Sequence, residues 1–139
     1  MEILMVVAIM SIIVSMGVVT FAGLQRKGRD ERRKADIEQI RGALEFYRTN
    51  NNAYPTALPT PSPGLPFGFS FGDGTNTYLQ TIPSDPRSPA RKYYYSTSGS
   101  DYTLATQLES TSSCASTPPA NSCGTGLACN YCLGAYGQK

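Results

Sequence analysis

Apolar and polar positions divide the chain into an apolar run, an amphipathic stretch and a polar remainder. No charged residue occurs from Ile3 to Leu24, and a helix rising about 1.5 Å per residue over this run spans roughly 33 Å, enough to cross a bilayer core. A cleaved signal peptide would start with basic residues and have a shorter apolar core. We therefore predict a retained membrane helix, with Glu2 as the acid at its start.

Helical periodicity continues beyond the apolar run. Apolar residues at helical spacing form a stripe among charged ones: Ile37, Ile40, Leu44 and Tyr47. Because the first proline is Pro55, the pattern predicts one helix from about Ile3 to about Asn50. Glycine costs up to about 1 kcal/mol relative to alanine in a helix, so Gly17 and Gly23 are the predicted places for local bending or melting.

The remaining residues predict a small β-rich head. The segment 55–66 is a proline-rich loop, and Phe69 and Phe71 are expected to fold back onto the helical stripe. Segments 78–79 and 82–83 suggest a short turn of helix. Tyrosine- and threonine-rich segments then predict an antiparallel hairpin, with strands at 92–96 and 102–108 joined through 97–101. The expected fold class is α+β, with a hydrophobic transmembrane helix (1–24), an amphipathic helix (25–54) and a head (55–139) that ends in a cysteine-rich loop.

Composition argues against an enzyme. The chain contains no histidine, which removes the commonest general base and metal ligand at neutral pH, and no nucleophile lies near a base. We expect no cofactor. Calcium binding by Asp73, Asp85 and Asp101 is disfavoured because these acids are scattered and lack an ordered spacing.

A cluster of basic residues follows the apolar run: Arg26, Lys27, Arg29, Arg32, Arg33 and Lys34. The favoured interpretation is a solvated helix surface whose charges meet acids such as Asp36, Glu38 and Glu45. Attraction to anionic lipid headgroups is an alternative. Nucleic acid is disfavoured, because the formal net charge is only +2 and aromatic residues are absent beside the cluster.

All four cysteines lie near the C-terminus: Cys114, Cys123, Cys129 and Cys132. An even number of cysteines in a region rich in Gly, Ser and Asn favours two structural disulfides in an oxidising compartment. A zinc site and reactive thiols are the alternatives, although only the last two cysteines have the C-x2-C spacing. Four cysteines allow three pairings, and the spacing does not choose among them.

The basic cluster conflicts with the expected orientation. By the positive-inside rule it belongs in the cytoplasm, whereas the cysteines and the Ser/Thr-rich loops beyond it suggest an extracytoplasmic head. A short basic leader that once preceded Glu2 and was then removed would resolve the conflict. We therefore expect an upstream leader.

Several segments together resemble type IV pilins and the pseudopilins of type II secretion: Met1 to Ile13, Lys34 to Ile40, Leu44 to Tyr47, Asn52 to Pro55 and, more loosely, Ile82 to Arg87 and the Tyr93-to-Leu108 hairpin. The resemblance covers about the first 55 residues well and the rest in outline. In that family a glutamate follows Phe-Thr-Leu-x, so this sequence starts about three residues late. The family commonly has a proline near the end of the apolar run, where this chain has Val19-Thr20-Phe21.

The resemblance implies a structural subunit of a helical filament. It pairs Glu2 with the N-terminal amine of the adjacent subunit, and it places apolar assembly contacts at Ile3, Leu4, Val7, Ile9, Ile12 and Ile13. In such a filament the acids that meet the basic cluster lie on neighbouring subunits. The implied partners are further copies of the chain, inner-membrane lipid before assembly, the pilus assembly machinery and prepilin peptidase. The implied localisation is the inner membrane and then an extracellular filament on the cell surface.

Three functions are weighed. A type IV pilus subunit for adhesion, motility or surface contact is favoured by the Ser/Thr/Pro-rich, disulfide-closed periphery. The alternative is a type II secretion major pseudopilin, which forms a short periplasmic fibre that drives protein export. A membrane-anchored binding module that never polymerises is the third, and it predicts that Glu2→Ala leaves function intact.

Overall fold

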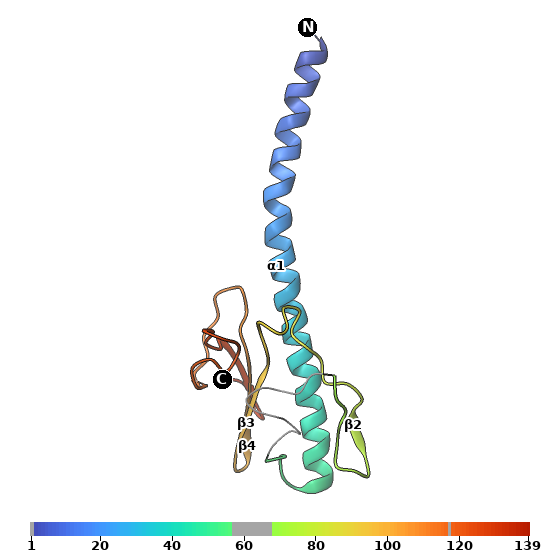
Figure 1. Cartoon of the computed structure of the whole chain (residues 1–139), viewed down its shortest axis with the longest axis vertical. Helices are drawn as coiled ribbons and strands as arrows, with labels where there is room; N and C mark the ends of the chain where they lie inside the picture. Colours follow the sequence, from blue (N-terminus) through green and yellow to red (C-terminus); the bar gives the residue numbers. More distant parts are fainter. Residues whose placement is uncertain (1, 57–67, 117) are drawn as a thin grey trace.

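The protein is a long helix with a small head packed around its second half (Figure 1). The computed structural model describes residues 2–56, 68–116 and 118–139, and it leaves the side chains of residues 2, 16–20 and 22 undescribed. One helix, α1, runs from Glu2 to Asn51, as predicted. It ends because Asn52 adopts a positive φ of 55° and donates its amide to the Arg48 carbonyl at 2.7 Å, a left-handed C-terminal cap.

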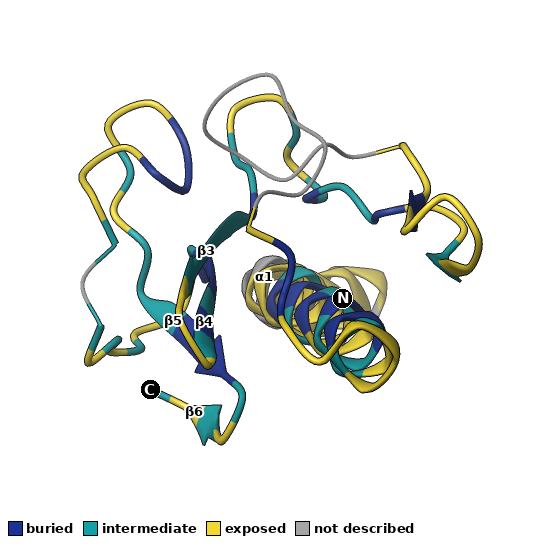
Figure 2. Cartoon of the chain, turned by 90° about the horizontal axis from the view of Figure 1, so that it is seen from below, coloured by how far each residue is buried: buried dark blue, intermediate teal, exposed yellow. Residues whose placement is uncertain are grey.

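The head contains two antiparallel sheets. β1 (Phe71–Gly72) pairs with β2 (Thr77–Leu79). A second sheet has the order β3-β4-β5-β6 and consists of Tyr94–Ser98, Asp101–Thr106, Tyr131–Gly134 and Gly137–Gln138. Seen along the helix axis, this larger sheet lies to one side of α1 (Figure 2). The α+β class and the antiparallel hairpin are confirmed.

Two predictions about the head were wrong. Tyr78 and Leu79 belong to strand β2 and not to a turn of helix, because Leu79 pairs with Phe71 across the small sheet. Both residues pack against the core and are partly buried. The cysteine region, expected to be a loop, supplies β5 and β6. β5 extends the hairpin by pairing with β4, which places Cys132 opposite Ala105.

The core lies between the predicted helical stripe and the sheets. Ile37, Ile40 and Leu44 are buried against Tyr102, Leu104 and Leu133. Of the two phenylalanines expected to fold onto the stripe, Phe71 is buried and stacks on Tyr47 with ring centroids 5.4 Å apart. Phe69 is 66% exposed. The prediction was therefore wrong for Phe69. The proline-rich segment 57–66 lies outside the described residues.

Two disulfides close the C-terminal region. Cys114 pairs with Cys132 and Cys123 pairs with Cys129, each with a Cα–Cα distance of 5.3 Å. No cysteine is left free. The predicted disulfides are therefore confirmed, and the pairing that the spacing left open is defined. The first bridge fastens the loop after β4 to strand β5.

Candidate functional site

The first half of α1 projects beyond the head as a rod (Figure 1). Its large apolar side chains from residue 3 to 14 are between 53% exposed, at Ile9, and 80% exposed, at Ile3. Phe21 and Leu24 are exposed too. We call residues 3–24 the apolar segment. A contiguous apolar surface of this kind indicates a buried contact with other copies, another protein or lipid.

Several predicted residues of the apolar segment are only partly described. Ile3, Leu4, Val7, Ile9, Ile12 and Ile13 all lie on the exposed rod. The Glu2 side chain and Gly17 lie outside the described side chains, and Gly23 faces open space. Within the described part of the chain, no helix is sufficiently long and apolar to cross a membrane. The predicted span includes residues 16–20 and 22, whose side chains are not described.

Where the rod meets the head, one arginine is completely enclosed by acids. Arg33 has no exposed side-chain surface. Its Nε donates to Asp85 at 2.7 Å and its Nη1 donates to Asp30 at 2.8 Å. Nη1 also donates to Glu109 at 3.2 Å. Helix α1, the loop before β3 and the segment after β4 thus converge on a single guanidinium.

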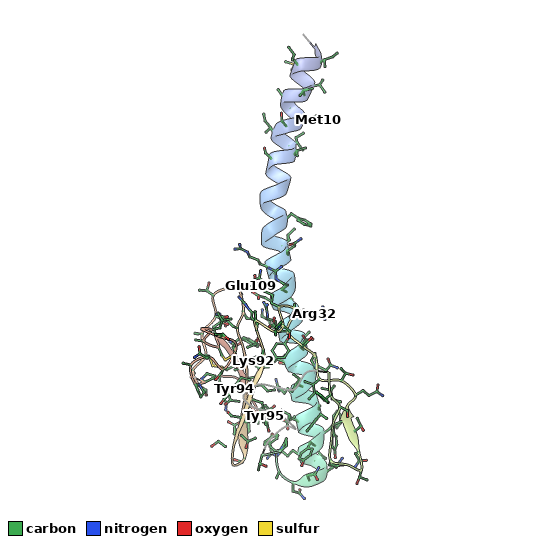
Figure 3. The ribbon with its side chains drawn as sticks, in the orientation of Figure 1. Met10, Arg32, Lys92, Tyr94, Tyr95 and Glu109 are labelled. Atoms are coloured by element: carbon green, nitrogen blue, oxygen red, sulfur yellow. A yellow bond between two sulfur atoms is a disulfide. The ribbon has the colours of Figure 1, made fainter. Side chains whose placement is uncertain are left out.

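Arg29, one turn earlier on α1, completes the group. We call Arg29, Asp30, Arg33, Asp85 and Glu109 the junction cluster. It holds Glu109 in a bidentate pair, with Nε to Oε1 at 2.7 Å and Nη2 to Oε2 at 2.8 Å. Asp30 accepts hydrogen bonds from the backbone amides of Glu109 and Ser110, both at 2.8 Å. Glu109 lies at the edge of the head nearest the projecting rod (Figure 3). The cluster therefore fixes the head to the helix at the base of the rod.

The surroundings of Glu109, Asp30 and Arg33 shift the pKa of each group in the direction that favours its charged form. The hydrogen bonds from Arg29 lower the pKa of Glu109 to about 2, although burial opposes them. Burial raises the pKa of Asp30, but the amides of Glu109 and Ser110 outweigh it, so that pKa lies below its usual value. Burial lowers the pKa of Arg33, and its hydrogen bonds to Asp85 and the other acids more than reverse this.

These contacts correct the interpretation of the basic cluster as one solvated surface. Arg33 and Arg29 pair with acids of their own chain, because folding brings Asp85 and Glu109 onto the helix. Lys34 pairs with Glu31 at the surface. For Arg26, Lys27 and Arg32, pairing between subunits stays a prediction.

Two of the acids expected to meet neighbouring subunits also have partners within the chain. Asp36 accepts a hydrogen bond from the Tyr93 hydroxyl at 2.6 Å. Glu45 accepts from the hydroxyls of Tyr54 and Tyr102, at 3.0 and 3.1 Å. Tyrosines of the head thus satisfy acids along the buried side of α1. Only Glu38 of the three is exposed, beside Arg41.

The three scattered aspartates have three separate surroundings. Asp73 caps the β1–β2 turn by accepting from the amides of Thr75 and Asn76, Asp85 joins the junction cluster, and Asp101 pairs with Lys139. Among the residues that the structure describes, no group of three or more His, Cys, Asp or Glu side chains is arranged to hold a metal ion.

Sequence reasoning missed the junction cluster as a unit. Asp85 and Glu109 are 52 and 76 residues from Arg33, so no local spacing links them. The one local signal is the i, i+3 relation between Asp30 and Arg33. That spacing is common on exposed helices and does not distinguish a buried pair from a solvated one.

A groove of about 400 Å³ opens beside the cluster on the side of the rod. Its lining includes Arg26, Lys27 and Lys34 from the basic cluster, Glu31, and the segment Glu109–Ser110 of the head. Gly23, near the end of the apolar segment, forms its rim.

The long N-terminal helix and the small antiparallel head packed on its second half define a pilin-like protein. Comparison with curated proteins finds relatives in type II secretion. The chain is similar to the type II secretion system core protein G of Aeromonas hydrophila, with 30% identity over 92 residues, covering 62% of this chain and 63% of that protein. It is also similar to the proteins of that name from Vibrio cholerae (30%; 62% and 61%) and Klebsiella pneumoniae (27%; 62% and 64%).

These similarities confirm the resemblance to pilins and pseudopilins that the sequence pattern predicted. They also bear out the expectation of a structural protein rather than an enzyme. The chain spans less than two thirds of the length of these relatives. No family model matches the chain, and no solved structure matches it.

Proposed function

We propose that the chain is the subunit of a pseudopilus-like filament that serves protein secretion. The observation that carries the proposal is the exposed apolar segment, which leaves a rod of apolar side chains without cover from the head. In a membrane, lipid covers this rod. In a filament, the helices of neighbouring copies replace the lipid by close packing. The head then lies at the filament surface.

The similarity to type II secretion core protein G supports secretion over adhesion or motility. The preferred function is thus the alternative of the sequence analysis, a fibre on the periplasmic side of the inner membrane. The proposed partners are other copies, inner-membrane lipid before assembly and a secretion machinery that includes a prepilin peptidase. The surface-exposed type IV pilus remains the second candidate, which the disulfide-closed periphery favours.

Glu2 has a specific task in this proposal. A carboxylate among packed apolar helices costs several kcal/mol unless it is paired, and the free N-terminal amine of an adjacent subunit would be the matching cation. This pairing would set the axial register of the filament. Apolar contacts alone are non-directional and do not define that register.

The test is to express the full chain with its assembly machinery and to examine fibres by electron microscopy while measuring protein export. We expect fibres containing the chain and export that depends on it. Glu2→Ala should abolish both, whereas Glu2→Asp, which keeps the carboxylate, should retain both. A detergent-soluble monomer that never polymerises would refute the filament. Surface filaments with export unaffected by deletion would favour the pilus.

A further inference from the structure

The groove beside the junction cluster, which we call the junction groove, lies where the apolar surface of α1 ends and the head begins. Gly23 forms its rim, and a side chain built there would meet nothing within 4 Å. Leu24 is the last exposed residue of the apolar segment, and the groove opens within one helical turn of it. A group that sits at the boundary between lipid tails and water would therefore lie at the level of this groove.

Some of the charged residues that line the groove form ion pairs within the chain, and others do not. Asp30 and Glu109 also line the groove, but Arg33 and Arg29 hold them. With Arg87, whose Nε lies 3.7 Å from Glu109, the arginines balance Asp30, Asp85 and Glu109. Lys34 forms a surface pair with Glu31, 2.9 Å apart. Within the described residues, Arg26 and Lys27 form no ion pair, although both line the groove. After these pairs are accounted for, two cations remain, so the groove favours an anionic ligand.

The position of these cations matches a lipid phosphate. Long basic side chains at the end of a membrane helix extend along the apolar surface and keep their charges at the headgroup level. Each basic residue near an anionic membrane surface contributes a favourable interaction. Ser110 of the head also lines the groove.

We propose that the junction groove binds the phosphate of an anionic phospholipid through Arg26 and Lys27 while the subunit is still in the membrane. The inference rests on the proposed function only in placing the apolar segment in a bilayer before assembly. It gives the basic cluster a task in the membrane-resident subunit: the bound headgroup holds the head at a fixed height above the lipid. Assembly into a fibre would then release this lipid.

The experiment uses the full chain in a mild detergent and measures lipid retention by native mass spectrometry. Phosphatidylglycerol and phosphatidylcholine, matched in acyl chains, are added at equal concentrations. We expect retention of one phosphatidylglycerol with an apparent affinity about tenfold or more above that for phosphatidylcholine. Arg26→Gln/Lys27→Gln should remove this preference. The matched control Arg32→Gln/Lys92→Gln loses the same charge outside the groove and should keep it.

Each other outcome overturns the proposal. Both lipids carry a phosphate, so equal retention would exclude a site that selects the net negative charge of an anionic headgroup. If both double variants lost the preference for phosphatidylglycerol equally, the preference would depend on the overall charge of the chain and not on the groove. Displacement of the lipid by inorganic phosphate at equal concentration would indicate a free-anion site. Normal lipid retention with defective fibres in Arg26→Gln/Lys27→Gln would assign these cations to contacts between subunits.

Failure of this inference is separable from failure of the proposed function. Fibres formed by the wild-type chain without lipid selectivity would refute the lipid site alone. Lipid selectivity in a chain that forms no fibres with its machinery would refute the filament alone.

Discussion

The Arg33 guanidinium lies in the interior among three carboxylates, where its desolvation must be offset by good hydrogen bonds. Four donated bonds between 2.7 and 3.2 Å meet this need. A buried ion pair is weak evidence for high stability, but removal of one partner leaves uncompensated charge in a poorly solvated place. The cluster is therefore more informative about how the head is oriented on α1 than about the total stability.

Arg33→Met should destabilise the fold by about 3 to 5 kcal/mol, because Asp85 and Asp30 would stay buried without their cation. Arg41→Gln, which breaks an exposed pair with Glu38, should cost less than about 1 kcal/mol. The free energies of unfolding of both variants can be measured with denaturant in the same detergent. Equal losses would show that the Arg33 environment is solvated. Arg33→Met/Asp85→Leu should recover part of the loss, since it removes both members of the closest pair.

The pKa of Glu109 predicts a defined pH dependence. Because its folded pKa of about 2 is below the unfolded value of 4.5, the ionised group contributes stability above pH 4.5. This contribution is lost as the pH falls from 4.5 toward 2. The difference in unfolding free energy between the wild-type chain and Glu109→Gln should be constant above pH 4.5 and should shrink below it. Glu38→Gln serves as the control for the loss of an exposed acid. A difference that does not vary with pH would contradict the assigned cause.

At the scale of elements, the sequence pattern predicted those helices and strands that depend mainly on residues close together in the chain. The stripe from Ile37 to Tyr47 predicted the helix and its buried side, and tyrosine-rich alternation predicted the β3–β4 hairpin. β5 was not predictable in this way, because Tyr131–Gly134 is short and becomes a strand through pairing with β4. The same limit applies to Tyr78–Leu79, and to Arg33, whose partners arrive from distant segments.

The disulfide pairing predicts a ranking of the two bridges. The Cys114–Cys132 bridge spans 18 residues and the Cys123–Cys129 bridge spans 6. A larger loop restricts the unfolded chain more, so replacing Cys114 and Cys132 by alanine should cost about 3 kcal/mol, against about 2 kcal/mol for the other pair. Denaturant unfolding of the two double variants tests the order, and alkylation should find no free thiol in either. A free thiol would contradict the pairing, and a reversed order would contradict the loop argument.

At the scale of the whole molecule, the chain divides into a head with its own core and a rod with none. All the buried apolar residues of the described structure lie from Ile37 onward, whereas the described apolar side chains of the rod are exposed. The stability of the head and the capacity to assemble should therefore depend on different residues. In this respect the junction cluster lies at the boundary, because it fixes the direction in which the rod leaves the head.

This separation gives the last prediction. Ile9→Asp places a charge on the rod, where assembly would bury it against apolar helices at a cost of several kcal/mol, so fibres should disappear from electron micrographs. The unfolding midpoint of the head, followed by near-ultraviolet circular dichroism of its tyrosines, should not change, because Ile9 contacts nothing in the head. Ile9→Leu preserves volume and apolarity and should restore fibres. Fibres formed by Ile9→Asp would show that the rod is not the assembly surface, and a shifted midpoint would show that the rod and the head are energetically coupled.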